Sequence, residues 1–355
     1  MENDTNKHKH EHKKEDMLLA FELSGEHETL PESEVLACMR ALGIDHRIVR
    51  SGEQFLILDI SGEPSQILST RLAMTHHIIS VILECDPSES SILESVRDAL
   101  ITIPRGETFS VRARQLISTP LSSAHMERLI GGVIFERNKV NEVKVDLTNP
   151  DHRFRAIITK DSCIFGEVLA SIDRRQFEER KPHKKPFFYP GAISPVIARA
   201  IVNICEIRSG DLVLDPFCGT GGILVEAGLI GARVIGIDVQ QSMIRGAEMN
   251  LRSHGFEYQL LCGDACNLPL ADRSIDAVVT DPPYGRSAVV MAESIESLYR
   301  NALLDMHRVI ANGGHAVVVS DFELLWAEDI GFTVTELHTQ RVHRSLTRYI
   351  MALCK

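Results

Sequence analysis

The sequence lacks the features that would place it in a membrane, in a secretory pathway or among zinc-binding proteins. Its longest apolar runs fall well short of the roughly 18 to 20 residues that a membrane span needs. The N-terminal residues are polar and contain no apolar core of a signal peptide, so we expect a cytoplasmic protein with no membrane partner. None of the eight cysteines forms a Cys-x-x-Cys pair, which argues against a zinc site or a disulfide framework.

Positive charge is also scarce, since the 355 residues carry a net charge of −11. The deficit is uneven. Residues 104–185 hold 16 Lys+Arg against 11 Asp+Glu, a local excess of five positive charges. Because an acidic protein can bind a polyanion through one basic region, the charge pattern permits an RNA partner without requiring one.

Composition and periodicity divide the chain into five segments. Residues 1–16 almost lack apolar side chains and are expected to form a disordered tail. Residues 17–62 and 63–172 both mix short strands with helices, which indicates α+β structure. Residues 173–190 are charged and contain prolines, so they are expected to be a linker, and residues 191–355 form the last domain.

The last domain has the most regular pattern. Amphipathic helices alternate with short apolar strands, which we expect at residues 211–215, 233–238, 258–262, 275–280, 314–320, about 331–337 and 348–353. This alternation predicts an α/β fold with a mostly parallel, doubly wound sheet. In such sheets ligands bind at the carboxyl ends of the strands.

A glycine-rich turn, Asp-Pro-Phe-Cys-Gly-Thr-Gly-Gly, follows the first of these strands at residues 215–222. Glycines allow the backbone to approach a ligand closely at the N-terminus of a helix. The turn lacks the lysine of a phosphate-binding loop, and its spacing differs from the Gly-x-Gly-x-x-Gly of dinucleotide-binding proteins. Asp215 would repel a phosphate but suits a cationic amino acid or a sulfonium group.

Three further carboxylates follow neighbouring strands. Asp238 is placed to bind a ribose diol, Asp264 to accept a hydrogen bond from an adenine amino group, and Asp281 follows the fourth strand. Together with Asp215 they describe one pocket for S-adenosylmethionine. The expected cofactor-binding residues are Asp215, Pro216, Phe217, Cys218, Gly219, Thr220, Gly221, Asp238, Asp264, Ala265 and Asp281.

Asp281 also opens the run Asp-Pro-Pro-Tyr, which continues to Gly285. A carboxylate and a proline carbonyl can accept hydrogen bonds from a planar amino group, and a tyrosine ring can cover the base that carries it. Read alone, the run could be a sharp turn after a strand. Because the glycine-rich turn lies upstream, we favour an amino-group site whose catalytic residues are Asp281, Pro282, Pro283 and Tyr284.

Residues 191–355 resemble the class I methyltransferases that modify amino groups of bases, because they combine this run with the glycine-rich turn. Residues 145–155, after the strand at 108–114, look like a THUMP domain, an RNA-binding module. Residues 187–195 and 342–348 also match, and the whole resembles the archaeal tRNA (guanosine-10 N2)-methyltransferase family. The resemblance implies a ferredoxin-like domain at 17–62, a THUMP domain at 63–172 that binds tRNA, and a Rossmann-like catalytic domain.

The resemblance also implies a reaction, the transfer of one or two methyl groups from S-adenosylmethionine to the N2 amine of guanosine-10 in tRNA. The base must be flipped out of its pair to reach the pocket. Its N2 lone pair is delocalised, so we expect Asp281 and the Pro282 carbonyl to orient the amine and Tyr284 to stack on the base. No metal is needed, and a monomer is expected.

Basic residues on the THUMP-like strands and in the linker are candidates for contacts with RNA phosphates. The residues are Arg112, Arg114, Arg153, Arg155, Lys184 and Lys185. Each could instead belong to a solvated surface. Contacts of this kind weaken steeply with salt.

Three other functions share some of these features. The nearest is an N2-methyltransferase for another tRNA guanosine or for ribosomal RNA. A DNA adenine-N6 enzyme shares the Asp-Pro-Pro-Tyr run but not the THUMP-like region. A non-catalytic RNA-binding module would show damaged motifs, whereas all four carboxylates are present.

Overall fold

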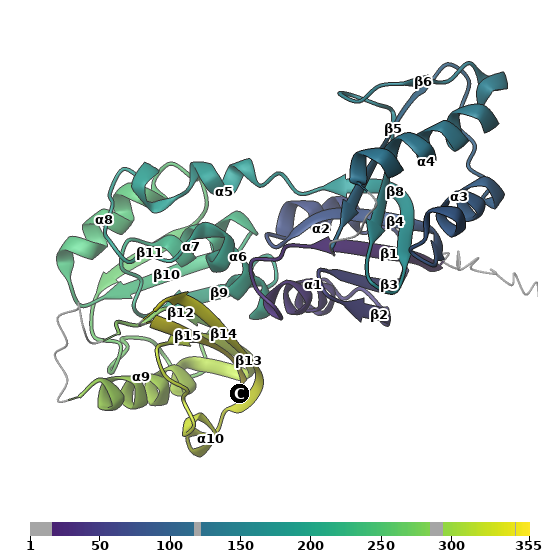
Figure 1. Ribbon diagram of the computed structural model, residues 1–355. Coiled ribbons are helices and arrows are strands. Elements are labelled where there is room, and N and C mark those ends of the chain that lie inside the picture. The colour runs from purple at the N-terminus through teal and green to yellow at the C-terminus, as the bar shows by residue number, and fades with distance from the viewer. Residues whose placement is uncertain (1–15, 117–121, 285–293, 345) are drawn as a thin grey trace, which may run out of the picture.

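The computed structural model describes residues 16–116, 122–284, 294–344 and 346–355. These residues form two sheets in two halves of the molecule, with α1 and α6 lying between them (Figure 1). The predicted tail, apart from Asp16, and Gly285 lie outside the described residues. The α/β fold with an α+β N-terminal region is confirmed.

The N-terminal half is built on one mixed sheet. Its strands are β1 (Asp16–Leu23), β2 (His46–Gly52), β3 (Phe55–Ser61), β4 (Thr75–Cys85), β5 (Thr108–Gln115), β6 (Lys144–Val145), β7 (His152–Ile158) and β8 (Cys163–Ser171). Its helical segments are α1 (Leu30–Ala41), α2 (Ser65–Arg71), α3 (Glu89–Asp98), α4 (Ser123–Arg137) and the 3₁₀ turn η1 (Lys139–Asn141).

The strand order in this sheet is β2-β3-β1-β4-β8-β7-β5-β6. The antiparallel pair of β1 and β4 joins the strands of the first α+β region to those of the second. The two regions therefore share one continuous sheet, and a division of the chain at residue 62 stays a prediction.

The alternation expected in β5 is present. Phe109, Val111 and Ala113 are buried beneath α4, and α4 begins where the Ser122 hydroxyl accepts a hydrogen bond from the amide of His125. Because side chains alternate along a strand, Arg112 and Arg114 lie on the opposite face.

The predicted linker at 173–190 has structure of its own. It contains α5 (Arg175–Glu179) and the 3₁₀ turn η2 (Pro182–Lys184), and α5 runs along the C-terminal half in Figure 1. Phe177 is fully buried, and Arg180 Nε donates to Glu226 Oε1 at 2.7 Å. The segment therefore packs against the last domain over part of its length.

The C-terminal half, named the catalytic half here for its predicted role, contains the predicted mostly parallel sheet. Its strands are β9 (Leu212–Asp215), β10 (Arg233–Asp238), β11 (Tyr258–Cys262), β12 (Ile275–Thr280), β13 (Ile310–Ser320), β14 (Thr333–His343) and β15 (Leu346–Cys354). Its helices are α6 (Pro195–Ile204), α7 (Gly222–Leu229), α8 (Gln241–Leu251), α9 (Ile295–Val309) and α10 (Ala327–Ile330). In the order β11-β10-β9-β12-β13-β15-β14, the last two strands are antiparallel to their neighbours.

Helices cover both faces of this sheet. Val213 of β9 packs in the same core as α6, α7 and α8, while the next residue, Leu214, packs with α9. A strand buried on both faces reads as a continuous apolar run, which is why β9 and β12 stand out in the sequence. In the parts of the chain that the structure describes, no helix combines the length and apolarity of a membrane span.

A buried polar junction joins the two halves. Glu34 of α1 is fully buried and accepts hydrogen bonds from the amides of Ala73 and Met74 and from Nδ2 of Asn203, at 2.9, 2.8 and 2.8 Å. Asn203 lies on α6 of the catalytic half, and its Oδ1 accepts from Arg71 Nε at 3.0 Å. The side chain of Glu34 thus satisfies donors from both halves.

We expect Glu34→Ala to lower the free energy of unfolding by about 3 kcal/mol, because it leaves three buried donors without an acceptor. Glu34→Gln keeps one acceptor oxygen and should cost less. The measurement is urea unfolding, and Glu53→Ala, at an exposed position in the same half, should change stability by less than about 0.5 kcal/mol. An equal effect of the two alanine variants would contradict the role of the junction.

Candidate active site

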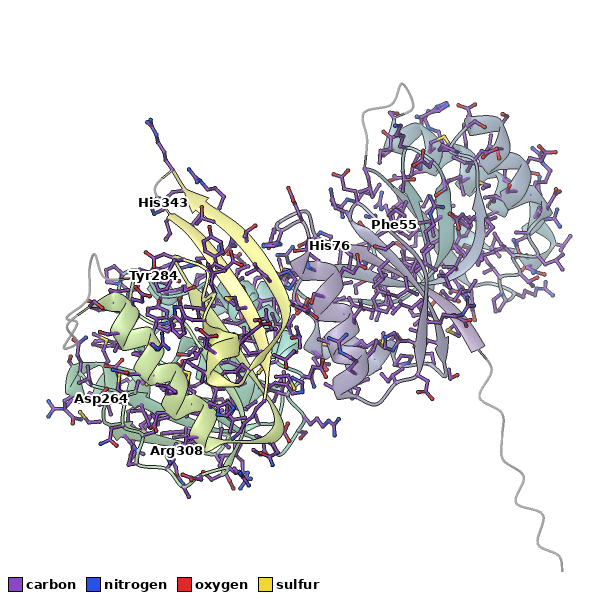
Figure 2. The ribbon with its side chains drawn as sticks, turned by 90° about the horizontal axis from the view of Figure 1, so that it is seen from below. Phe55, His76, Asp264, Tyr284, Arg308 and His343 are labelled. Atoms are coloured by element: carbon purple, nitrogen blue, oxygen red, sulfur yellow. The ribbon has the colours of Figure 1, made fainter. Side chains whose placement is uncertain are left out.

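A cavity of about 890 Å³ opens at the carboxyl ends of the parallel strands. Ligand pockets in proteins typically measure about 300 to 1,000 Å³. Figure 2 shows Asp264 and Tyr284 in the catalytic half, with His343 on the C-terminal hairpin and Phe55 in the other half. The predicted residues that line the cavity are Asp215, Pro216, Phe217, Cys218, Gly219, Thr220, Asp238, Asp264, Ala265, Asp281, Pro282, Pro283 and Tyr284.

Asp215 ends β9 and is 1% exposed. Its Oδ1 accepts hydrogen bonds from Thr280 Oγ1 at 2.7 Å and from the amide of Phe217 at 3.2 Å. Burial raises the pKa of Asp215 to about 7. Among the described residues no Lys, Arg or His forms an ion pair with this carboxylate, so a bound cation would stabilise its charged form.

The glycine-rich turn is held by the neighbouring strand. The amide of Gly219 donates to Asp238 Oδ2 at 3.0 Å, and Gly219 and Gly221 have φ angles of +49° and +77°. A Cβ on Gly221 would lie 2.4 Å from Leu251 of α8. Gly221, predicted to bind the cofactor, is not among the lining residues. Its role in this structure is a close contact between the turn and α8.

Asp238 and Asp264 are both fixed by backbone amides. Asp238 Oδ1 accepts from the amide of Gln240 at 2.8 Å, and Asp264 Oδ1 accepts from the amide of Cys266 at 2.9 Å. Burial raises the pKa of Asp238. A carboxylate oxygen has two lone-pair sites, so each oxygen that binds an amide can still accept a hydrogen bond from a ligand hydroxyl or amine.

Asp281 and Tyr284 form a hydrogen-bonded pair at the other end of the cavity. The Tyr284 hydroxyl donates to Asp281 Oδ1 and accepts from Arg348 Nε at 3.1 Å. Burial raises the pKa of Asp281, and the charge of Arg348 and the hydrogen bond from Tyr284 oppose that rise. The guanidinium carbon of Arg348 lies 5.9 Å from the centroid of the Tyr284 ring. The ring orientation is therefore fixed in the absence of a base.

The Pro282 carbonyl was predicted to accept from the target amine. It accepts from the buried Tyr299 hydroxyl of α9 at a long 3.4 Å. Burial raises the pKa of Tyr299, and the charges of Tyr284, Asp281 and Asp321 add to the effect. Since a carbonyl oxygen has two lone pairs, Pro282 keeps one for a substrate.

Sequence reasoning missed several lining residues. Arg348 and His343 come from the C-terminal hairpin, Asp321 follows β13, and Tyr189 precedes α6. Asp321 carries the same signal as the four predicted carboxylates, since it too lies at the carboxyl end of a strand. The match of residues 342–348 to the family pointed at the hairpin, but nothing local assigned Arg348 to Tyr284.

Two of the predicted RNA-contacting arginines form ion pairs inside the N-terminal half. Arg155 Nε and Nη2 donate to Glu22 at 2.8 and 2.6 Å, and Arg114 Nη1 donates to Glu22 Oε1 at 2.9 Å. Although burial raises the pKa of Glu22, the hydrogen bonds and charges of these two arginines hold it below its usual value. Both side chains thus have an acceptor inside the protein, and a phosphate contact at either one stays a prediction.

The other predicted basic residues differ in exposure. Arg112 and Arg153 are exposed on the sheet, although Arg112 Nη1 also reaches Glu127 at 3.4 Å. Lys184 is exposed as well. Lys185 is half-buried and so less exposed than these residues. Burial lowers its pKa, and the charge of Glu226 opposes that change. Lys185 thus belongs to the packing between the segment after α5 and α7.

Comparison with known proteins finds a matching domain family for each half of the chain. Residues 91–166 match the THUMP domain model, and residues 182–350 match the RMKL-like methyltransferase domain model. The tRNA (guanine(10)-N2)-dimethyltransferase of Methanothermobacter thermautotrophicus is 39% identical over 338 residues, covering 93% of this chain and 97% of that protein. The enzyme of the same name from Methanocaldococcus jannaschii is 31% identical, covering 94% and 98%.

The chain belongs to the tRNA (guanine(10)-N2)-dimethyltransferase family. Members of a class I methyltransferase family take the methyl group from S-adenosylmethionine, so the predicted cofactor is confirmed at the level of the family. The crystal structure of TrmN from Thermus thermophilus has a TM-score of 0.59 and 21% identity, and the match covers 95% of this chain and 99% of that one. That likeness supports the fold of both halves together.

We expect the stability of the protein to depend on pH through Asp215. Between pH 4 and 7 the unfolded chain ionises this carboxyl while the folded protein keeps its proton, so stability falls as pH rises. Asp215→Asn removes this loss. At pH 8 the free energy of unfolding, measured by urea, should be higher for the variant than for the parent by up to about 4 kcal/mol. This difference should vanish near pH 4.

The matched control is Glu257→Gln, an exposed carboxylate of the same half. Its effect should be small and independent of pH. A difference between Asp215→Asn and the parent that stays constant from pH 4 to pH 8 would show an ordinary pKa for Asp215.

Proposed function

We propose that this protein transfers two methyl groups from S-adenosylmethionine to the N2 amine of guanosine-10 in tRNA. The observation that carries the proposal is similarity over nearly the whole chain to enzymes with this name. The similarity includes the RNA-binding half, which influences the choice of nucleotide, as well as the pocket. A monomer and a cytoplasmic location remain predictions.

The residues of the cavity fit this methyl donor. Asp215 and Asp238 are desolvated carboxylates, and a ligand that brings a positive charge and a ribose diol would relieve both. Asp264 and Ala265 would hold the adenine end. The donor supplies an electrophilic methyl group on a sulfonium and needs no metal.

Asp281 would act on the guanine. Its Oδ1 is occupied by Tyr284, which leaves Oδ2 to accept a hydrogen bond from the N2 amine. The Pro282 carbonyl would accept the second hydrogen and so orient the nitrogen lone pair. As the amine becomes positively charged, the Asp281 carboxylate can take its proton, and a pKa raised by burial makes that transfer easier.

A second candidate is an N2-methyltransferase for a different guanosine. A tRNA (guanine(6)-N2)-methyltransferase from Thermus thermophilus is 26% identical over 258 residues and is covered over 74% of its length. A U6 snRNA (guanine-N(2))-methyltransferase from Bos taurus is 33% identical, but only 40% of its length is covered. The lower coverage in both cases favours guanosine-10.

We expect Asp281→Asn to lower kcat for an unmodified tRNA transcript by at least about 100-fold, because it removes the proton acceptor. Binding of tRNA should be unchanged in a filter-binding assay, since Asp281 lies inside the cavity. The exposed Asp329→Asn serves as the control with parental activity. Mapping should place the methyl groups on nucleotide 10, and methylation at another nucleotide would refute the proposed position.

We expect Arg112→Glu with Arg153→Glu to raise the KM for tRNA and to leave kcat nearly unchanged. The slope of log affinity against log salt should fall by about one for each lost phosphate contact. Arg47→Glu reverses an arginine that is 73% exposed on edge strand β2 and should have little effect. An equal change in all variants would indicate non-specific charge repulsion instead.

A further inference from the structure

Asp321 is a fifth carboxylate at the strand ends, and the chemistry described above does not use it. It directly follows β13, the neighbour of β12 in the sheet. The ladder between β12 and β13 ends at Thr280 opposite Val318, and the ladder between β13 and β15 ends at Ser320 opposite Tyr349. Continued by a few residues, the two ladders place Asp321 between the Asp-Pro-Pro-Tyr run and Arg348.

The hydrogen bonding of Asp321 is incomplete. Its Oδ1 is buried and has no hydrogen-bond partner among the described residues. Six buried side-chain atoms in that part of the chain share this property, and Asp321 Oδ1 is the one whose residue lines the cavity. Leaving a buried acceptor without a donor costs about 1–3 kcal/mol, and more when it is charged. A ligand that brings a donor would remove this cost.

The neighbouring donors for which the structure shows hydrogen bonds are directed to other acceptors. The Tyr284 hydroxyl already donates to Asp281, and Arg348 Nε donates to Tyr284. The Tyr299 hydroxyl donates to the Pro282 carbonyl. The Asp281–Tyr284–Arg348 group is thus satisfied internally, whereas the Asp321 carboxylate lines the same cavity with one oxygen that has no donor among the described residues.

Guanine carries the complementary donors. Its Watson–Crick edge places the N1–H beside the N2 amine, so a base whose amine faces Asp281 has a second donor next to it. Adenine and 2,6-diaminopurine have a bare N1 at that position, which is an acceptor. A carboxylate accepts only, so it attracts the guanine edge and repels the other two.

We propose that Asp321 is a specificity residue that accepts a hydrogen bond from guanine N1–H and so selects guanine over bases that carry an amine beside a bare N1. This inference rests on the proposed function, because it takes guanine to be the base that enters the cavity. Asp281 would accept a hydrogen bond from the amine that is methylated, and Asp321 would accept one from the N1–H of the same ring.

The test compares two tRNA transcripts. One has guanosine at position 10 and the other has 2,6-diaminopurine riboside there, with the pairing partner changed to match. Both present a 2-amino group, but only guanosine has N1–H. The parent protein should prefer guanosine by about 100-fold or more in kcat/KM, since a site built to bind an N–H rejects an analogue without it.

Asp321→Asn should greatly reduce the preference for guanosine over 2,6-diaminopurine. The asparagine amide can donate to the bare N1, so activity on guanosine should fall and the ratio of the two substrates should drop by at least about 30-fold. Glu323→Gln makes the same change at an exposed position two residues further along and should keep the parental ratio. Thermal unfolding and S-adenosylmethionine binding report whether each variant is folded.

The outcomes separate the two proposals. If the parent protein methylates neither transcript, the proposed function fails, and the role of Asp321 fails with it. If the parent methylates guanosine-10 but Asp321→Asn keeps the parental ratio, the role of Asp321 is refuted while the proposed function stands. An equal loss on both transcripts also refutes it, because Asp321 would then not distinguish the two bases.

Discussion

The buried junction around Glu34 is the constraint on which the rest of the structure depends. An isolated carboxylate in a protein interior is unfavourable, and burial raises the pKa of Glu34. Two backbone amides from its own half and the Asn203 amide of α6 together satisfy it. Because neither half alone completes this arrangement, the junction favours one relative placement of the RNA-binding sheet and the catalytic sheet.

A second constraint is the parallel sheet itself, which gathers acidic side chains at one edge. Asp215, Asp238 and Asp281 all have raised pKa values because burial disfavours their charged forms. In the described parts of the catalytic half, Arg348 is the cation that opposes this effect at Asp281, through its charge and through Tyr284. The cavity is therefore prepared for ligands that bring positive charge and hydrogen-bond donors.

The sequence predicted what depends on local pattern. The strands β9 to β12 and the carboxylates that follow them have apolar periodicity and turn residues as signals, and the cavity lining includes all four carboxylates. It did not predict that Arg114 and Arg155 would bind Glu22, which lies about 90 and 130 positions earlier in the chain. It also missed Arg348, because the contact with Tyr284 depends on how β15 pairs with β13. Pairings between distant segments have no local signature.

The two halves address different parts of one recognition problem. Under the proposed function the pocket would receive a single flipped base and distinguish it by its chemistry, but every guanosine in a tRNA would present the same edge to Asp281. The position of the nucleotide must therefore be measured by contacts elsewhere on the folded RNA, at a fixed distance from the cavity. The exposed Arg112 and Arg153 lie on the N-terminal sheet, and the junction at Glu34 and Asn203 sets how far that sheet is from the pocket. On this view, the buried polar contacts between α1 and α6 influence which guanosine is methylated without touching RNA.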